Sequence, residues 1–133
     1  MIVLDTHVLL WLDSGDPQLG PLARQRIEQA HRLSGVAVSA ISFWECAMLA
    51  RDKRIVLTKP VGGWRAELLA AGLRELPLDG GVATAAVGLA LSHQDPADRF
   101  IVATAQSHGA ELLTADLRLL QAGLQVSMVP ARL

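Results

Sequence analysis

The stretch Ile2-Val3-Leu4-Asp5-Thr6-His7 decides the predicted fold of this chain. Its first three residues are aliphatic and two of them are β-branched, which is typical of a short buried strand. Asp5 follows directly, and residues 6–12 are expected to form a helix. A carboxylate at the end of a buried strand is costly unless another group pairs with it. We therefore expect Asp5 to belong to a polar site at the end of the first strand.

The length and composition indicate one globular domain over residues 1–133. Hydrophobic residues make up 51% of the chain, which suffices for a core and argues against disorder. The net charge of −1 does not by itself indicate a nucleic-acid-binding protein. If four acids form a site, twelve basic residues face nine acidic ones elsewhere, and the remaining surface is mildly basic at +3.

The chain carries one cysteine, Cys46, so neither an intrachain disulfide nor a cysteine-based zinc site is expected. The apolar N-terminal run has no preceding Lys or Arg and is interrupted by Asp5, which does not fit a signal peptide. No apolar stretch reaches the roughly 18 residues that a transmembrane helix needs. We expect a cytoplasmic protein without a membrane segment.

Strand-like and helix-like segments alternate along the chain. This alternation predicts an α/β sandwich around a mostly parallel sheet, with ligand sites at the carboxyl ends of the strands. Pro77 excludes a central position for the strand that contains it, which is expected at an edge. The expected strands are 2–4, 36–38, 74–78, 111–113 and 126–129. The expected helices are 6–12, 19–30, 43–50, 64–71, 82–91, 96–108 and 115–121.

Four acidic residues have an ordinary structural explanation when each is taken alone. Asp5 could cap the helix that follows it, and Ser42-Phe43-Trp44-Glu45 matches a capping box. In Asp95-Pro96-Ala97-Asp98, the first aspartate would cap a helix and the second would lie in its first turn, near the positive end of the helix dipole. Thr114-Ala115-Asp116 repeats that arrangement, with the threonine as the cap.

Taken together, the four acids predict one shared site. All lie near the start of a helix, and three of those helices follow predicted strands, whose carboxyl ends share one edge of a parallel sheet. Carboxylates crowded into one cleft repel each other unless a cation is present. Oxygen ligands favour Mg²⁺ or Mn²⁺ over zinc, and such ions bind phosphates and generate a nucleophilic water. We therefore predict a metal site that cleaves phosphodiester bonds, formed by Asp5, Glu45, Asp98 and Asp116.

The segments that carry these acids resemble those of the PIN-domain family, and more closely those of the VapC-type ribonuclease toxins of bacterial toxin–antitoxin pairs. They occur in the family's order and at similar spacing along nearly the whole chain. The resemblance implies a three-layer α/β/α sandwich, a Mg²⁺- or Mn²⁺-dependent endoribonuclease, a homodimer, and inhibition by a cognate antitoxin protein. The segments are Val3-Leu4-Asp5-Thr6-His7, Ser42-Phe43-Trp44-Glu45, Asp95-Pro96-Ala97-Asp98-Arg99 and Leu113-Thr114-Ala115-Asp116.

The resemblance also implies a role for each acid. The family's acidic quartet falls on the same four residues, and its hydroxyl beside the last acid falls on Thr114. Asp5, Asp98 and Asp116 are expected to bind the metal, and Glu45 either binds it too or orients the attacking water. No histidine pair is placed for transfer to the RNA 2′-hydroxyl, so we expect hydrolysis.

Residues beside the acids are expected to support them. Thr6 and Thr114 each adjoin the site, and Arg99 could pair with a carboxylate or with a phosphate. His7 is expected at the periphery of the site or on the surface rather than as a ligand. Ala97 departs from the family, whose members often carry a large aromatic residue at that position.

The remaining aromatic and basic residues allow only less specific predictions. The tryptophans fall on apolar stripes and are expected in the core rather than as stacking platforms for RNA bases. The basic residues of the segment 51–59 either contact the RNA backbone or form a solvated helix end. These residues are Trp11, Trp44 and Trp64, and Arg51, Lys53, Arg54 and Lys59.

The first half of the chain carries more apolar residues than one small domain easily covers. Such surface marks interfaces, and the family resemblance suggests a homodimer contact and a groove for an antitoxin segment, whose arginine could pair with the acids. The alternative is that the sheet buries all of these residues. They are Leu9, Leu10, Trp11, Leu12, Leu19, Phe43, Trp44 and Met48.

Two other functions fit the sequence less well. An aspartyl-nucleophile phosphatase of α/β type needs Asp-x-Asp after the first strand, and this chain has Asp5-Thr6-His7. A receiver domain needs a lysine after a late strand, and Lys59 is the last lysine. A domain that only binds a partner would have no need to keep all four acids. Nothing in the sequence indicates a nucleotide cofactor.

Overall fold

A five-stranded sheet forms the centre of the computed structural model, which describes residues 1–91 and 95–133. All neighbouring strands are parallel, in the order β3-β2-β1-β4-β5. The strands are β1 (Ile2–Leu4), β2 (Val36–Ser39), β3 (Arg74–Leu76), β4 (Glu111–Thr114) and β5 (Met128–Pro130). The helices are α1 (Thr6–Ser14), α2 (Pro21–Leu33), α3 (Ile41–Arg51), α4 (Val61–Ala70), α5 (Gly80–Val87), α6 (Pro96–Ser107) and α7 (Leu117–Leu120).

The central strand β1 is buried on both faces, as its aliphatic sequence predicts. Its side chains alternate between the two cores: Ile2 and Leu4 belong to one, and Val3 belongs to the other. In register, Leu4 lies beside Leu113 of β4, and Val3 lies beside Ala37 of β2. The strand that opens the sequence therefore lies at the centre of the sheet and pairs with both β2 and β4.

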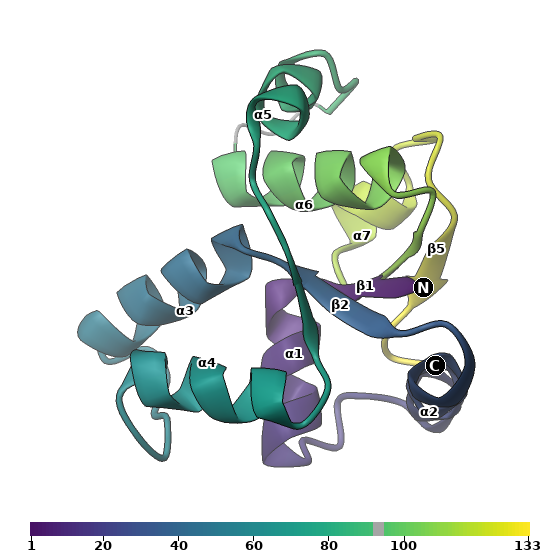
Figure 1. The fold of residues 1–133 in the computed structure, drawn as a ribbon. Coiled ribbons are helices and arrows are strands. Elements are labelled where there is room, and N and C mark those ends of the chain that lie inside the picture. Colours follow the sequence, from purple (N-terminus) through teal and green to yellow (C-terminus); the bar gives the residue numbers. More distant parts are fainter. Residues whose placement is uncertain (92–94) are drawn as a thin grey trace.

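Helices cover both faces of the sheet, and Figure 1 shows the two layers on opposite sides of β1 and β2. The helices α1, α2 and α4 pack with α3 on the face that Ile2 and Leu4 enter. The helices α6 and α7 pack on the opposite face, and α5 lies outside α6. The predicted α/β/α sandwich is confirmed, and its sheet is parallel throughout the part that the structure describes.

Several predicted boundaries differ from the structure. The helix expected at 43–50 begins two residues earlier, at Ile41, and the last strand lies at Met128–Pro130 rather than at 126–129. The edge position of β3 is confirmed, but the strand ends at Leu76 because Pro77 follows. Across residues 1–91 and 95–133, no helix has both the length and the apolar character required to cross a membrane.

Candidate metal centre

Five acidic side chains line one pocket of about 380 Å³ at the carboxyl ends of the central strands. The parallel sheet explains this convergence, since Asp5 follows β1 and Asp116 follows the neighbouring β4. The sequence prediction that the four acids share a cleft is confirmed. The pocket is lined by Asp5, Glu45, Asp95, Asp98 and Asp116, together with His7, Trp11, Ala115, Arg118 and Arg132.

Asp5 stands at the N-cap position of α1, but its side chain makes no capping hydrogen bond. Its Oδ2 instead accepts a hydrogen bond of 2.6 Å from the Thr114 hydroxyl at the end of β4. The residue is 8% exposed, and burial raises the pKa of its carboxyl, an effect that the Thr114 hydrogen bond partly offsets. Asp5 is therefore a site residue and not a helix cap.

Thr114 connects two of the acids and does not cap a helix. Besides donating to Asp5, its oxygen accepts a hydrogen bond of 3.1 Å from the backbone N–H of Asp116. The cap of α7 is Asp116 itself, whose Oδ1 accepts from the backbone N–H of Arg118 at 2.9 Å. The prediction that Thr114 caps this helix is wrong because the strand continues through Thr114.

Glu45 lies one turn into α3, and the predicted capping box around it is wrong. The helix begins at Ile41 and has no side-chain cap, so Ser42 lies inside the helix and not before it. The Ser42 hydroxyl is hydrogen-bonded to the Thr6 hydroxyl over 2.9 Å in a fully buried contact. Burial raises the pKa of Glu45, and a hydrogen bond with the Thr6 side chain partly offsets that rise. Thr6 thus links the Asp5 segment to Glu45.

Asp98 is buried in the first turn of α6, as predicted. Asp95 caps this helix by accepting from the backbone N–H of Ala97 at 3.0 Å, and Pro96 stands at its first position, so this prediction is confirmed. The pKa of Asp98 is raised to about 7, first by burial and then by the surrounding carboxylates, Asp5 first among them. The pocket therefore disfavours a full set of charged acids.

A cation of the protein itself lies between two of the acids. Arg118 Nη2 lies 3.0 Å from Asp116 Oδ2 and 3.7 Å from Asp98 Oδ2. In the residues that the structure describes, no three His, Cys, Asp or Glu side chains are already arranged as a metal-binding group. The convergence of the acids in one cleft is thus shown, whereas distances suited to a shared ion remain a prediction.

The donor set fits a hard divalent cation. All of the acidic side chains offer oxygen atoms, which suits Mg²⁺ or Mn²⁺. Burial, and after it the repulsion between the carboxylates, raises the pKa values of Asp5, Glu45 and Asp98, and a divalent ion would favour their charged forms. Arg118 already bridges Asp98 and Asp116, which shows that positive charge is favoured at this point.

Arg99 binds backbone carbonyls, whereas the sequence suggested a carboxylate or a phosphate. Its guanidinium donates to the backbone carbonyls of Ala86, Leu89 and Leu91 at 3.0–3.3 Å and so closes the end of α5. Ala86 lies in the last turn of α5, where carbonyls lack partners within the helix, and Leu89 and Leu91 lie in the segment that follows. Ala97 is buried, so a large aromatic side chain has no room there without rearrangement.

The predictions for the tryptophans are confirmed only in part, and the basic segment is exposed. Trp64 is buried, as predicted, and donates to Asp13 Oδ2 at 2.9 Å, whereas Trp44 is 50% exposed and the core prediction is wrong for it. Trp11 is half-buried at the rim of the acidic pocket, and His7 is exposed there. The segment 51–54 is exposed, which fits the solvated helix end.

Sequence reasoning missed Arg118 and Arg132 as residues of the pocket. Arg118 could have been found from its spacing, since it lies two residues after Asp116 and its side chain can reach back to that carboxylate. Arg132 could not have been found in that way, because it reaches the pocket from the loop after β5. Asp95 was identified only as a cap.

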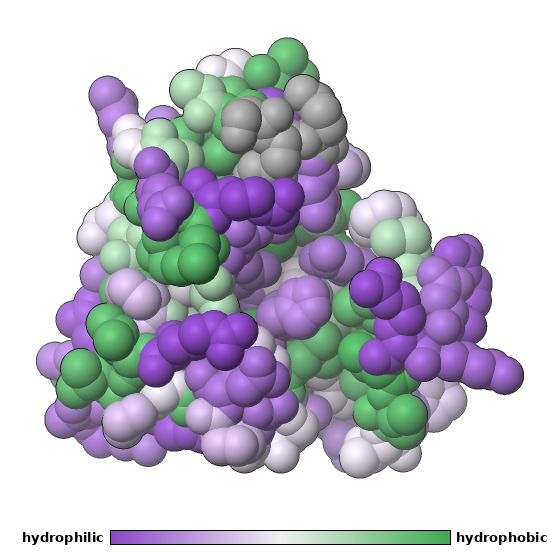
Figure 2. Space-filling view, turned by 180° about the vertical axis from the view of Figure 1, so that it is seen from behind, coloured by the Kyte–Doolittle hydropathy of each residue, from purple (hydrophilic) through white to green (hydrophobic). Residues whose placement is uncertain are grey.

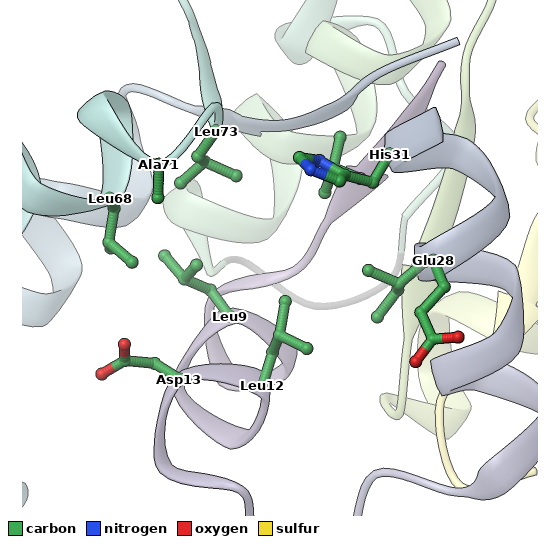
Figure 3. A pocket seen from close by; sticks show the side chains of 10 residues that line it. Leu9, Leu12, Asp13, Glu28, His31, Leu68, Ala71 and Leu73 are labelled. Atoms are coloured by element: carbon green, nitrogen blue, oxygen red, sulfur yellow. The ribbon is translucent and has the colours of Figure 1, made fainter. Parts of the chain in front are cut away.

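A second cavity, also of about 380 Å³, lies between α1, α2 and α4 and is mainly apolar. Figure 3 shows Leu9 and Leu12 of α1 facing Leu68 of α4 and Ala71, the residue that follows this helix, with the side chain of Leu73 beside them. Several residues of the predicted apolar surface are buried, namely Leu9, Leu19 and Phe43. The half-buried ones are Leu10, Trp11, Leu12 and Met48. Figure 2 shows that hydrophobic patches on one face are separated by hydrophilic side chains.

The family model for the PIN domain matches residues 2–124. The chain is 44% identical over 119 residues to Ribonuclease VapC22 of Mycobacterium tuberculosis, covering 89% of this chain and 88% of that protein. Its fold resembles a toxin-antitoxin complex from Klebsiella pneumoniae, with a TM-score of 0.66, 22% identity and 98% coverage of both chains. It also resembles VapBC2 from Rickettsia felis bound to a promoter DNA fragment, with a TM-score of 0.69, 15% identity and 98% coverage of both chains. The chain belongs to the PIN-domain family.

Proposed function

We propose that this chain is a metal-dependent endoribonuclease that hydrolyses RNA phosphodiester bonds and acts as the toxin of a toxin–antitoxin pair. The observation that carries the proposal is the convergence of Asp5, Glu45, Asp98 and Asp116 in one pocket. The ribonuclease name of the relative from Mycobacterium tuberculosis supports the activity. The chain would work as one nuclease domain over residues 1–133.

In this proposal Asp5, Asp98 and Asp116 hold Mg²⁺ or Mn²⁺, and Thr114 fixes the orientation of the first carboxylate through its 2.6 Å hydrogen bond. An ion held by these residues would supply a lowered pKa for a bound water molecule and positive charge to offset that of the phosphate oxygens. Glu45 on α3 would bind the ion as well or orient the attacking water, and its hydrogen bond with the Thr6 side chain supports this role.

The experiment that tests this function is RNA cleavage with a divalent-metal titration. Wild-type protein should cleave only when Mg²⁺ or Mn²⁺ is present. The Asp98→Asn variant should not cleave at any metal concentration in the titration. Asp52→Asn is the matched control, because Asp52 is exposed and pairs with Arg51 outside the pocket. Cleavage by Asp98→Asn at the wild-type rate would overturn the proposal.

The partner we propose is a cognate antitoxin, because the similar structure from Klebsiella pneumoniae is a toxin–antitoxin complex. The apolar cavity between α1, α2 and α4 would accept apolar side chains of that partner (Figure 3), and an antitoxin arginine would pair with the acids of the acidic pocket.

The test uses the protein encoded by the neighbouring small open reading frame. A Leu12→Glu change at the cavity should abolish co-purification, whereas Val87→Glu, at a position on α5 that is already 81% exposed, should leave it intact. Equal capture of both variants would remove the cavity from the proposal.

We further propose a cytoplasmic homodimer. The RNA substrate is consistent with that compartment, as is the free thiol of the buried Cys46. The exposed Trp44 on α3 offers apolar surface for a second copy. Sedimentation should give a dimer for the wild type and a shift toward monomer for Trp44→Glu. A wild type that sediments as a monomer at micromolar concentration would contradict the dimer.

A further inference from the structure

Arg132 brings a second cation to the acidic pocket, and it is held differently from Arg118. Both arginines line the pocket with Asp5 and Asp116. Arg118 is bound to the carboxylate of Asp116 and lies near that of Asp98. Within residues 1–91 and 95–133, no carboxylate forms an ion pair with Arg132, whereas Arg118 is paired with Asp116.

The Arg132 guanidinium is held by neutral groups. Its central carbon lies 5.1 Å from the centroid of the Trp11 ring, which is a cation–π arrangement. Its Nη1 donates to Gln18 Oε1 at 3.3 Å. Trp11 itself packs against the core that includes Leu9 and Leu19, so the ring is a firm support. The side chain is thus pre-organised at the rim of the pocket while its charge stays available.

The backbone around Arg132 is fixed as well. The strand β5 pairs with β4 so that Pro130 lies beside Thr114, and the N–H of Ala131 donates to the Thr114 carbonyl at 2.8 Å. The N–H of Gly20 donates to the Ala131 carbonyl at 2.9 Å. A Cβ at Gly20 would overlap the backbone of Arg132 and Leu133, so the close approach requires glycine there. Thr114, which holds Asp5 through its hydroxyl, therefore also fixes the backbone next to Arg132 through its carbonyl.

We propose that Arg132 binds a phosphate of the RNA backbone next to the phosphate that is cleaved. This inference rests on the proposed ribonuclease function. The acids repel the polyanionic substrate, and a cation at the rim that does not pair with them offsets that repulsion for one neighbouring phosphate. A guanidinium binds phosphate through two parallel hydrogen bonds, and the contact with the Trp11 ring restrains the Arg132 guanidinium beside the pocket for such binding. Arg132 is a substrate-binding residue, and Trp11 and Gln18 are its positioning residues.

The test is the binding of a short unstructured RNA labelled with a fluorophore, measured by anisotropy in Mg²⁺ buffer. A Glu45→Gln background keeps the three proposed metal ligands and suppresses cleavage. Adding Arg132→Gln should weaken binding about tenfold, the loss of one charged hydrogen-bonding contact. It should also reduce the slope of log affinity against log salt by about 0.7, the value for one contact on a single strand.

Two further variants make the outcome decisive. Arg32→Gln removes the same charge from the exposed end of α2, away from the pocket, and should change neither affinity nor slope. Arg132→Lys keeps the charge and should restore the slope while recovering part of the affinity. Circular dichroism checks that each variant is folded.

The inference and the proposed function fail in different ways. If the wild type cleaves RNA and Arg132→Gln binds RNA as tightly as its parent, with an unchanged salt slope, the Arg132 proposal is overturned and the ribonuclease proposal stands. A wild type that neither binds nor cleaves RNA overturns both. An equal loss in Arg132→Gln and Arg32→Gln points to net charge and also overturns the role of Arg132.

Discussion

The Thr114 hydroxyl oxygen lies 2.6 Å from Asp5 Oδ2, so the last residue of β4 holds the carboxylate that follows β1. Both residues are buried, and they are 109 positions apart in the chain. The same hydroxyl oxygen accepts from the N–H of Asp116. One threonine therefore sets the relative position of two acids of the pocket.

Replacing Thr114 should expose this role. Thr114→Val keeps the shape but leaves Asp5 without its donor, so we expect a loss of stability of about 1–3 kcal/mol and strongly reduced RNA cleavage. Thr114→Ser keeps the hydroxyl and should retain most of both. Urea unfolding and cleavage rates measure the two effects. Wild-type cleavage by Thr114→Val would show that Asp5 needs no fixed orientation.

Removing the Asp5 charge should stabilise the metal-free protein while abolishing cleavage. Burial raises the pKa of this carboxyl, so its charge counts against the folded state, and Asn can still accept from Thr114. We expect Asp5→Asn to melt at a slightly higher temperature than the wild type without metal. Mg²⁺ should stabilise the wild type and have a much smaller effect on the variant. Equal metal-induced shifts would count against Asp5 as a ligand.

The stability of the metal-free protein should fall as the pH rises from about 4 to about 7. The pKa of Asp98 is raised from 3.8 to about 7 in the folded state, so the folded state binds a proton that the unfolded state has already lost. The stabilisation is fully present below the unfolded pKa and is lost as the pH passes the folded pKa. Thermal melts across this range should show the decline for the wild type and a smaller one for Asp98→Asn. An equal decline of the melting temperature with pH in both proteins would exclude Asp98 as the source of the decline.

Arg118 should compete with a bound metal ion. Its guanidinium is bonded to Asp116 and lies 3.7 Å from Asp98, both of which are proposed ligands. Arg118→Gln should therefore bind Mn²⁺ several times more tightly and be less stable without metal, as measured by calorimetric titration and thermal melts. Arg51→Gln is the control, since Arg51 pairs with Asp52 away from the pocket. Weaker Mn²⁺ binding by Arg118→Gln would mean that the arginine assists the ion instead.

Arg99 should matter for stability rather than for RNA binding. Its guanidinium holds three carbonyls around the end of α5. Arg99→Gln should cost about 1.5–3 kcal/mol of unfolding free energy, the range for a hydrogen bond to a charged group, and leave KM for RNA unchanged. Denaturant unfolding and steady-state cleavage measure these. A raised KM at wild-type stability would instead place Arg99 in substrate binding.

The sheet and the position of the acids could be predicted from short-range patterns. Aliphatic runs such as Ile2–Leu4 identify strands, and an acid directly after such a run lies at the carboxyl edge in any parallel arrangement. The N-cap at Asp95 follows from local chemistry and is confirmed. These features depend on residues that are close together in the sequence.

The errors concern contacts that the local sequence does not encode. Ser42 matches a capping residue, but its hydroxyl is satisfied by Thr6, 36 positions earlier, and the helix starts before it. Arg99 adjoins an acid in the sequence, yet the end of α5 presents carbonyls that bind it. Arg132 reaches the pocket through the pairing of β5 with β4. In each case the tertiary partner decides the role.

The most direct test of the account is the identity of the RNA ends that the protein produces in Mg²⁺. Hydrolysis by a metal-activated water in the acidic pocket predicts 3′-hydroxyl and 5′-phosphate ends, no 2′,3′-cyclic phosphate, and no products when Asp98→Asn replaces the wild type. Cyclic phosphate ends, or the same products from Asp98→Asn and from reactions containing a chelator, would contradict the account.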